Sequence, residues 1–230
     1  MPRYIEAEWL DRLPVDEPSA LSSRDDLRRL NAIMGHPGLV ARILGREPDF
    51  PRMQSIVDLG GGDGTFLLAL ARKLPQRASA FTGTIVDPHG RVAEETRRGL
   101  EAAGCKLSVI RADAIEFLSF EPPRCDVIIG NLFLHHLSET ALVRLMSHIT
   151  QLTPLFIACE PHRGSFPLLA SRLLGIIGCN HITRHDAPAS VRAGFRQKEL
   201  SFLWPARTGW HLQEYRAGPF SHCFIARHVA

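Results

Sequence analysis

One stretch of the sequence constrains the fold more than any other, because residues 56–66 read IVDLGGGDGTF. A short apolar run ends in Asp58, a cluster of glycines follows, and strong helix formers begin at Phe66. This pattern predicts a strand, a tight turn and a helix, which together open a βαβ unit. Glycines are needed where the backbone takes positive φ angles or approaches a ligand closely, and the following helix presents free N–H groups at its start. We therefore expect a ligand to bind at this turn.

The spacing of the glycines distinguishes between known kinds of ligand-binding turn. A dinucleotide fingerprint that starts at Gly60 requires a glycine at position 65, where the chain has Thr65. A phosphate-binding P-loop requires a lysine followed by Ser or Thr, and the sequence does not supply one at that place. The pattern Asp58-x-Gly60-x-Gly62-x-Gly64 resembles the glycine motif of class I S-adenosylmethionine (SAM)-dependent methyltransferases. A nucleotide loop of another kind and a plain strand-to-helix turn are the alternatives.

Composition limits the classes of function that remain. A chain of 230 residues is long enough for one α/β domain with additions. Its net charge is only +3 and its arginines are scattered, which argues against a nucleic-acid partner. The five cysteines are isolated and form no C-x-x-C pair, so we expect free thiols in a reducing, cytoplasmic environment. The N-terminus does not resemble a signal peptide, and the longest apolar stretch, residues 166–179, is too short to span a membrane.

Apolar runs and their spacing predict the remaining strands. Near-continuous runs indicate buried parallel strands, and alternating runs near the C-terminus indicate a hairpin. The expected strands after the first are residues 81–86, 107–110, 125–130, 155–159, 210–216 and 222–227. With helices between them, they predict an α/β fold with a Rossmann-like, seven-stranded, mostly parallel sheet and a C-terminal antiparallel hairpin, as in class I methyltransferases. We expect residues 1–52 to form an N-terminal helical lid and residues 53–230 the methyltransferase domain, with 162–187 as an insertion that covers the substrate.

Acidic residues stand at the ends of the second and third predicted strands. Asp87 lies where an α/β nucleotide site binds the ribose hydroxyls, although it could instead cap the next helix. The resemblance gives Asp113 a hydrogen bond to the adenine amino group, and the same side chain could also cap the short helix 114–119. The resemblance also implies that SAM is the cofactor and that the segment after the fourth strand contacts both cofactor and substrate. The cofactor-binding residues predicted in this way are Asp58, Gly60, Gly61, Gly62, Asp63, Asp87, Pro88, Asp113, Ala114, Asn131 and Leu132.

Histidines in two places are candidates for a catalytic base. His135 and His136 follow the fourth strand in an apolar frame, so at least one of them should face the pocket. Residues 180–188 are expected to form a loop before a short helix, where Asp186 either caps that helix or orients His185. A histidine with a pKa near ~6.5 can take a proton from a phenol. His136 and His185 are therefore the first candidates, and His135 is the next.

The N-terminal helices and the later strand ends supply candidates for the substrate pocket. Apolar residues at helical spacing precede a Gly-His-Pro-Gly turn, and its His36 is either a pocket residue or a solvated loop histidine. The segment 166–177 is apolar on most sides and either covers a lipophilic pocket or packs in the core. The predicted substrate-binding residues are Met34, His36, Glu160, His162 and His181. No set of His, Cys, Asp and Glu has the spacing of a metal site, so we expect catalysis without a metal.

Together these features predict an enzyme that transfers a methyl group from SAM to a small acceptor. The chain is similar to bacterial O-methyltransferases of secondary metabolism, which implies O-methylation of an aromatic, phenolic or polyketide-type acceptor. Methylation of carbon or nitrogen is the alternative among enzymes, because the shape of the pocket selects the acceptor atom. A non-catalytic SAM-binding module that acts through a partner is the alternative outside enzymes. We expect a small-molecule acceptor, no nucleic acid and no membrane span, and the sequence is also compatible with a homodimer.

Overall fold

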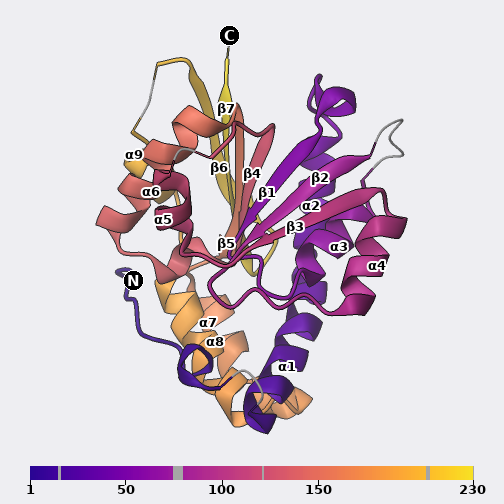
Figure 1. Cartoon of the computed structure of the whole chain (residues 1–230). Helices are drawn as coiled ribbons and strands as arrows, with labels where there is room; N and C mark the ends of the chain where they lie inside the picture. The colour runs from indigo at the N-terminus through magenta and orange to yellow at the C-terminus, as the bar shows by residue number, and fades with distance from the viewer. Residues whose placement is uncertain (15–16, 75–79, 121, 206–207, 230) are drawn as a thin grey trace.

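The fold is built on a seven-stranded sheet in the computed structural model, which describes residues 1–14, 17–74, 80–120, 122–205 and 208–229 (Figure 1). The strand order across the sheet is β3-β2-β1-β4-β5-β7-β6. The strands are β1 (Ser55–Leu59), β2 (Phe81–Val86), β3 (Cys105–Ile110), β4 (Val127–Asn131), β5 (Leu155–Pro161), β6 (Trp210–Ala217) and β7 (Ser221–His228). The seven predicted strands are all present, with ends that differ by one or two residues.

The direction of the strands sets the position of the ligand-binding edge. β1 pairs in parallel with both β2 and β4, whereas β5 pairs in parallel with β4 and antiparallel with β7. The chain order reverses between β1 and β4, and α/β sheets bind ligands at such a point, outside the carboxyl ends of the strands. The glycine turn after β1 and the segment after β4 therefore lie side by side. The predicted mostly parallel sheet with a C-terminal antiparallel hairpin is confirmed.

Helices cover both faces of the sheet (Figure 1). α2, α3 and α4 pack on one face, and α5, α6 and α9 pack on the other. β1 shows the two-residue period of a strand directly, because Ile56 belongs to the first core and Val57 to the second. The helices are α1 (Pro18–Met34), α2 (His36–Leu44), α3 (Thr65–Ala71), α4 (Glu94–Ala102), α5 (Ala114–Ser119), α6 (Glu139–Leu152), α7 (Ser165–Arg172), α8 (His181–Ala193) and α9 (Glu199–Leu203), with the short 3₁₀ helices η1 (Leu10–Arg12), η2 (Phe50–Arg52), η3 (Leu134–His136) and η4 (Leu174–Ile177).

The two N-terminal helices are present, as expected, but they occupy different positions. Gly35 separates them with a φ of 68°, the left-handed conformation in which glycine commonly ends a helix. α2 packs into the core beside α3. α1 instead lies near α7 and α8, beyond the carboxyl ends of the strands (Figure 1). α1 thus lies outside the sheet core, whereas α2 is part of it. The role of residues 1–52 as a lid stays a prediction.

Helix α8 corrects the expectation of a loop at residues 180–188. Asn180 caps this helix, because its side chain accepts a hydrogen bond from the backbone N–H of Thr183 at 2.9 Å. Ile182 is buried on the inner face, and such packing stabilises the helix although Pro188 lies inside it. A proline removes one helical hydrogen bond, which costs free energy inside a helix. The tertiary packing that outweighs this cost is not visible in the local sequence.

Residues 1–12, which we call the N-terminal strap, run across the segment after β4. The Arg3 guanidinium donates hydrogen bonds to three backbone carbonyls of that segment. These carbonyls belong to Leu134, His135 and Leu137, at 3.3, 3.1 and 2.8 Å. The buried Arg163 also donates a hydrogen bond to the carbonyl of Met1 at 3.1 Å. The N-terminal strap is therefore fixed at the carboxyl edge of the sheet.

Composition gave two expectations, one about the thiols of the cysteines and one about membrane-spanning segments. All five cysteines carry free thiols and are buried, as their isolated positions predicted. Across the described residues, no helix combines the length and the apolar character that crossing a membrane requires.

Asp26 fixes α1 against α8. Its buried carboxylate accepts hydrogen bonds from the backbone N–H of Asn180 at 2.7 Å and from the hydroxyl of Thr183 at 3.1 Å. It also forms an ion pair with Arg29. Removing the carboxylate would leave buried donors without an acceptor, which costs free energy.

We expect Asp26→Ala to lower the free energy of unfolding by about 2–4 kcal/mol, because two hydrogen bonds to a buried charge are lost. Asp25→Ala is the matched control, since Asp25 is exposed and pairs with Arg28 on the surface of the same helix. Its effect should stay within about 0.5 kcal/mol. Urea denaturation of both variants measures the difference. Equal costs would show that this carboxylate does not hold α1 in place.

Candidate active site

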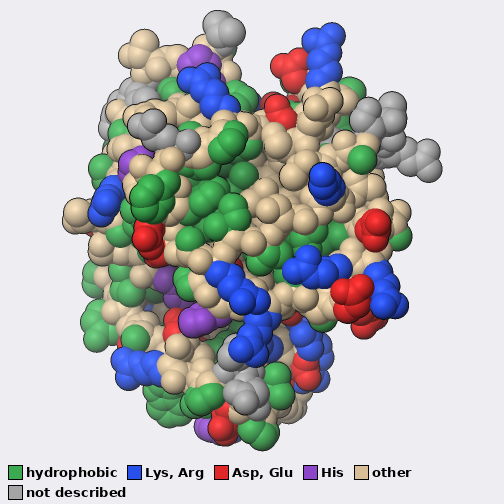
Figure 2. Space-filling view, viewed as in Figure 1, with side chains coloured by type: hydrophobic (Ala, Val, Ile, Leu, Met, Phe, Trp, Pro, Cys, Tyr) green, Lys and Arg blue, Asp and Glu red, His purple; other side chains and the backbone are tan. Residues whose placement is uncertain are grey.

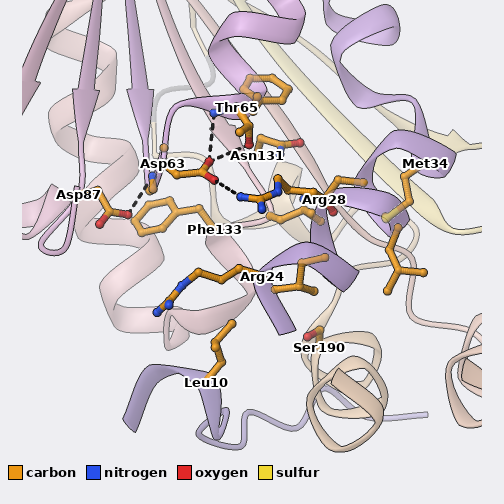
Figure 3. Close-up of a pocket in the computed structure, with 18 of the residues that line it drawn as sticks. Leu10, Arg24, Arg28, Met34, Asp63, Thr65, Asp87, Asn131, Phe133 and Ser190 are labelled. Atoms are coloured by element: carbon orange, nitrogen blue, oxygen red, sulfur yellow. Dashed lines mark hydrogen bonds and ion pairs between the residues drawn. The ribbon is translucent and has the colours of Figure 1, made fainter. Parts of the chain in front are cut away.

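A cavity of about 1360 Å³ lies at the carboxyl ends of β1, β2 and β4. The glycine turn, the strand ends, α3 and α4 form one part of its wall, and residues of η1, α1, α7, η4 and α8 form another part. Figure 3 shows side chains from several of these elements around one space. In the space-filling view, histidine and basic side chains gather on the lower half of the molecule (Figure 2). Pockets for one small ligand usually measure ~300–1,000 Å³, so this cavity has room for a cofactor and an acceptor.

The turn after β1 has a shape that its glycines allow. A Cβ atom at position 60 would come within 2.6 Å of the Phe133 ring, and Gly60 itself has a φ of 70°. Gly64, with a φ of 78°, directly precedes α3. Asp63 closes the turn, because its carboxylate accepts hydrogen bonds from the backbone N–H and the hydroxyl of Thr65 at 3.0 and 2.7 Å (Figure 3). The turn therefore presents its backbone to the cavity.

Two acids stand at the ends of the neighbouring strands. The Asp87 carboxylate accepts hydrogen bonds from the N–H groups of Gly62 at 3.1 Å and His89 at 2.8 Å. Asp113 caps α5, and one of its oxygens accepts from two backbone N–H groups at 2.8 and 3.0 Å. The predicted cap at Asp113 is confirmed. Both carboxylates also line the cavity, where a ligand hydroxyl or amino group can donate to them.

Asp58 is the buried acid of this group. Burial, together with the charge of Asp87, raises the pKa of Asp58 to about 8. Neither carboxylate oxygen has a hydrogen-bond partner among the described residues. Without a ligand this group is therefore largely protonated at pH 7. A ligand that brings a hydrogen-bond donor or a positive charge would satisfy its oxygens and favour the ionised form. SAM carries both, and the residues of this part of the cavity therefore fit the cofactor that the sequence resemblance implies.

A buried histidine holds the end of β4 in place. His36 lies in the first turn of α2, and burial lowers its pKa, so the ring is neutral at pH 7. Its Nδ1–H donates to Asn131 Oδ1 at 2.7 Å, and its Nε2 accepts from the hydroxyl of Ser221 at 2.6 Å. His36 is therefore neither a solvated loop histidine nor part of the described cavity wall. It positions Asn131, which does line the cavity.

His135 lies at the centre of a buried charge network. The Glu160 carboxylate accepts hydrogen bonds from the backbone N–H groups of Phe133 and Leu134 at 3.0 and 2.8 Å, and from Nδ1 of His135 at 2.7 Å. The other ring nitrogen, Nε2, lies 3.7 Å from the carboxylate of Glu8 in the N-terminal strap. Burial alone would lower the pKa of His135, but the hydrogen bonds and charges of Glu160 and Glu8 raise it to about 9. The ring is therefore positively charged at pH 7.

His136 lies beside this network and has the opposite protonation state. Its side chain is 35% exposed and lines the cavity. The centroids of the two histidine rings are 4.1 Å apart. Burial and the positive charge of His135 lower the pKa of His136 to about 4. His136 is therefore neutral at pH 7 and can accept a proton.

The second predicted position for a catalytic base, His185 with Asp186, lies outside this cavity. His185 stacks on Trp9 with ring centroids 3.7 Å apart, and its Nδ1 is 2.8 Å from Asp186. Asp186 in turn accepts hydrogen bonds from the backbone N–H groups of Trp9 and Leu10, and so holds the N-terminal strap. His185 and His181 line a separate, shallow groove. The expectation that these residues cover the pocket failed because the segment is a helix that turns them outward.

Of the remaining predicted substrate-binding residues, one lines the cavity and two do not. Met34 lines the cavity. Glu160 is fully buried beneath η3 and acts on His135 rather than on a ligand. His162 lies by β7, with its ring 6.1 Å from that of His222, and is not part of the described cavity wall. The end of β5 therefore holds the neighbouring segments in place and contributes little to the cavity wall.

One group of three side chains in the described part of the chain could approach a metal ion. Ligand atoms of Glu8, His135 and His136 lie within 4.8 Å of one another. Nε2 of His135 and the Glu8 carboxylate are 3.7 Å apart, a distance that one zinc ion bonded to each at roughly 2.0–2.2 Å can bridge. The sequence did not indicate this group, because Glu8 is distant from both histidines along the chain.

Several cavity residues were not predicted from the sequence. Glu8, Leu10 and Asp11 reach the cavity from the N-terminal strap, and no local pattern marks them. Ser190 lines the cavity from α8, and its hydroxyl donates a hydrogen bond to Glu8. Helical spacing of the small residues in that segment could have revealed Ser190, had the segment been assigned as a helix.

All of the predicted cofactor-binding residues line this one cavity, as do His135, His136 and Met34. They come from segments far apart in the sequence, which the strand order brings to the same edge of the sheet. Their individual roles in binding and catalysis stay predictions.

Comparisons with known proteins agree with this fold. Residues 56–153 match the family model of a methyltransferase domain. No curated protein matches the chain. Among solved structures, the plantazolicin methyltransferase BamL, in complex with a triazolic desmethylPZN analogue and SAH, the demethylated form of SAM, is 12% identical with a TM-score of 0.64. The match covers 93% of this chain and 92% of BamL.

Larger methyltransferases share the fold as well. An O-methyltransferase family protein from Burkholderia thailandensis is 17% identical, with a TM-score of 0.57 over 96% of this chain and 66% of its own. The mitomycin 7-O-methyltransferase MmcR is 22% identical, with a TM-score of 0.57 over 95% of this chain and 60% of its own. This chain thus spans less than two thirds of MmcR and about two thirds of the Burkholderia protein. The match of residues 56–153 to a methyltransferase domain implies SAM as cofactor, in agreement with the resemblance seen in the sequence.

Proposed function

We propose that the chain transfers a methyl group from SAM to an oxygen atom of a small aromatic acceptor in secondary metabolism. One observation carries this proposal: the acids and glycines expected to bind the cofactor share a single cavity with two adjacent histidines of opposite charge state. A site for SAM alone would not need a neutral histidine at its wall. The volume of about 1360 Å³ leaves room for an acceptor beside the cofactor.

Different cofactor-binding residues would contact different parts of SAM. In the proposed arrangement Asp87 accepts hydrogen bonds from the ribose hydroxyls, and Asp113 accepts one from the adenine amino group. Asp58, which has no partner among the described residues, faces the positively charged part of the cofactor. When bound, SAM supplies an electrophilic methyl carbon attached to a good leaving group. The protein contributes mainly by holding the acceptor oxygen in line with that carbon, which can lower the barrier by several kcal/mol.

The two histidines would have different roles in removing the proton of the acceptor hydroxyl. A phenol has a pKa near ~10, so at neutral pH its hydroxyl must lose a proton during methyl transfer. His136 is neutral and exposed to the cavity, and it would accept this proton. His135 is already protonated and is held by Glu160 and Glu8, so it would orient His136 and contribute positive charge near the forming phenolate.

The solved structures with this fold support more than one acceptor atom. MmcR is named as a mitomycin 7-O-methyltransferase, which favours oxygen. RosA from Streptomyces davawensis, 19% identical, is named as an N,N-8-amino-8-demethyl-D-riboflavin dimethyltransferase, which makes nitrogen the second candidate. A nitrogen nucleophile with a free lone pair needs no base before the transfer, so the histidine pair favours oxygen. The same pair argues against a non-catalytic SAM-binding module.

Replacing Asp87 tests the cofactor site. We expect Asp87→Asn to weaken SAM binding by about 1.5–3 kcal/mol, because a charged acceptor of hydrogen bonds is lost while its shape is kept. Glu94→Gln is the matched control, since this exposed acid on α4 pairs with Arg98 outside the cavity. Isothermal calorimetry measures both affinities, and a thermal melt confirms that each variant is folded. Equal affinities in the two variants would remove Asp87 from the cofactor site.

The pH dependence of methyl transfer identifies the base. A base must be unprotonated to act, so a base with a lowered pKa of about 4 gives full activity at pH 6 and loses it only as the pH falls toward 4. If His135 were the base, its raised pKa of about 9 would make the rate climb steadily up to that pH. We expect the first profile in kcat/KM, measured with a phenolic acceptor.

Substitution of the histidines completes this test. We expect His136→Gln to lower single-turnover methyl transfer by about 10²–10⁴-fold while SAM affinity is kept. His185→Gln is the control, because His185 lies outside the cavity, and its rate should match that of the unmodified protein. If the variant at position 136 turns over normally, His136 is not the base.

Chelation tests whether the three clustered side chains hold a catalytic metal. We expect methyl transfer to survive dialysis against EDTA, because a metal ligand must be deprotonated, whereas the ring of His135 is protonated and hydrogen-bonded to Glu160. The rate before and after dialysis is the measurement. Loss of activity that zinc or magnesium restores would make these three residues metal ligands.

A further inference from the structure

The cavity has a second, apolar region between α1 and the segment from α7 to η4. Its wall here consists mainly of aliphatic side chains from both sides, although Arg24 and Asn31 of α1 and Ser171 of α7 also line the cavity. The aliphatic side chains are Leu27, Leu30, Ile33 and Met34 from α1, and Pro167, Ala170, Leu174 and Ile177 from α7 and η4. None of these aliphatic side chains can hydrogen-bond to a cofactor or to a polar acceptor. The region is therefore suited to an apolar ligand group.

This apolar wall reaches the surface of the molecule. Leu21, Ile33 and Ile177 all line the cavity, yet they are 51%, 69% and 58% exposed. On the outside, Ile176 continues the apolar surface and is 81% exposed. Hydrophobic side chains are visible at the lower end of the molecule, where α1, α7 and α8 lie (Figures 1 and 2). Large exposed apolar side chains in one place commonly mark a binding surface.

Most of the ionisable groups lie on one side of the cavity. The acids of the strand ends and the histidine pair lie at the carboxyl edge of the sheet, and Glu8 of the N-terminal strap lies beside His135. On α1, Arg28 forms an ion pair with Asp63 of the glycine turn (Figure 3), in addition to one with Asp25 of its own helix. A ligand that is complementary to both regions of the cavity therefore has a polar end at the histidines and an apolar end between α1 and η4.

We propose that the methyl acceptor is an amphiphile, with a hydroxyl-bearing head at His136 and an extended apolar tail between α1 and the α7–η4 segment. The identity of the head rests on the proposed function. The tail rests on separate observations, namely the aliphatic lining and its continuation to the surface. The tail leaves the cavity past Ile33 and Ile177, so its end contacts solvent.

The test uses binding rather than turnover, with the full chain saturated with SAH. Calorimetry measures the affinity of phenol and of 4-alkylphenols up to 4-octylphenol, each below its aggregation limit. We expect each added methylene to tighten binding by about threefold to fourfold, the equivalent of ~0.8 kcal/mol per buried methylene. Affinity that does not change with chain length, or no binding by any member, overturns the proposal.

Two matched pairs of variants locate the tail. Ala170→Trp narrows the apolar region, whereas Leu169→Trp places the same side chain on the exposed face of α7. Ile177→Glu puts a charge in the wall, whereas Ile176→Glu puts it on the outer surface. We expect the first member of each pair to weaken octylphenol binding at least tenfold and to leave phenol binding unchanged, and the second member to change neither. Equal effects within both pairs would place the tail elsewhere and overturn the proposal.

Methyl transfer, measured separately, distinguishes this inference from the proposed function. Binding that depends on chain length without transfer supports the tail site and contradicts O-methylation of phenols. Transfer to phenol without any dependence on chain length supports O-methylation and contradicts the tail site.

Discussion

The geometry of the candidate site depends on one buried carboxylate. Glu160 has no exposed surface, and a charge in such a place is costly unless hydrogen-bond donors surround it. Here the donors are backbone N–H groups of the segment after β4 and the ring of His135. That segment cannot unwind without leaving the charge unsatisfied. Glu160 therefore fixes the path of the chain at the point where the cofactor and the acceptor are expected to meet.

The same carboxylate explains an unusual backbone conformation nearby. Leu132 has a φ of 54°, which is uncommon for a residue with a side chain. Its N–H donates to the carbonyl of Cys159 at 2.9 Å, and the next N–H, that of Phe133, donates to Glu160. Hydrogen bonds on both residues hold the strained conformation in place, as is common at functional sites. The turn can then present His135 and His136 one after the other at the cavity.

The fold and the cofactor half of the site could be predicted from the sequence, because they depend on local patterns. Glycine spacing, apolar runs and acids at strand ends each act over a few residues, and the switch point of the sheet brings them together. The acceptor half depends on packing between distant segments. The N-terminal strap meets His135 across 132 positions of the chain, and the packing of α8 outweighs its proline. The sequence therefore predicted that at least one of His135 and His136 faces the pocket, and both line the cavity. It placed His185 over the pocket, whereas this residue lies outside the cavity, and it did not indicate Glu8.

The N-terminal strap also has a consequence for how the site assembles. It is attached largely by hydrogen bonds to backbone carbonyls, and it closes a very long loop, so we expect it to dock after the core and to detach before the core unfolds. While it is detached, His135 keeps Glu160 but loses Glu8, and one wall of the cavity is missing. Only the docked fraction of molecules would then be competent to bind the acceptor, and the apparent affinity falls with that fraction. Substitutions in the N-terminal strap that touch neither ligand would thus change acceptor affinity through the population of the docked state.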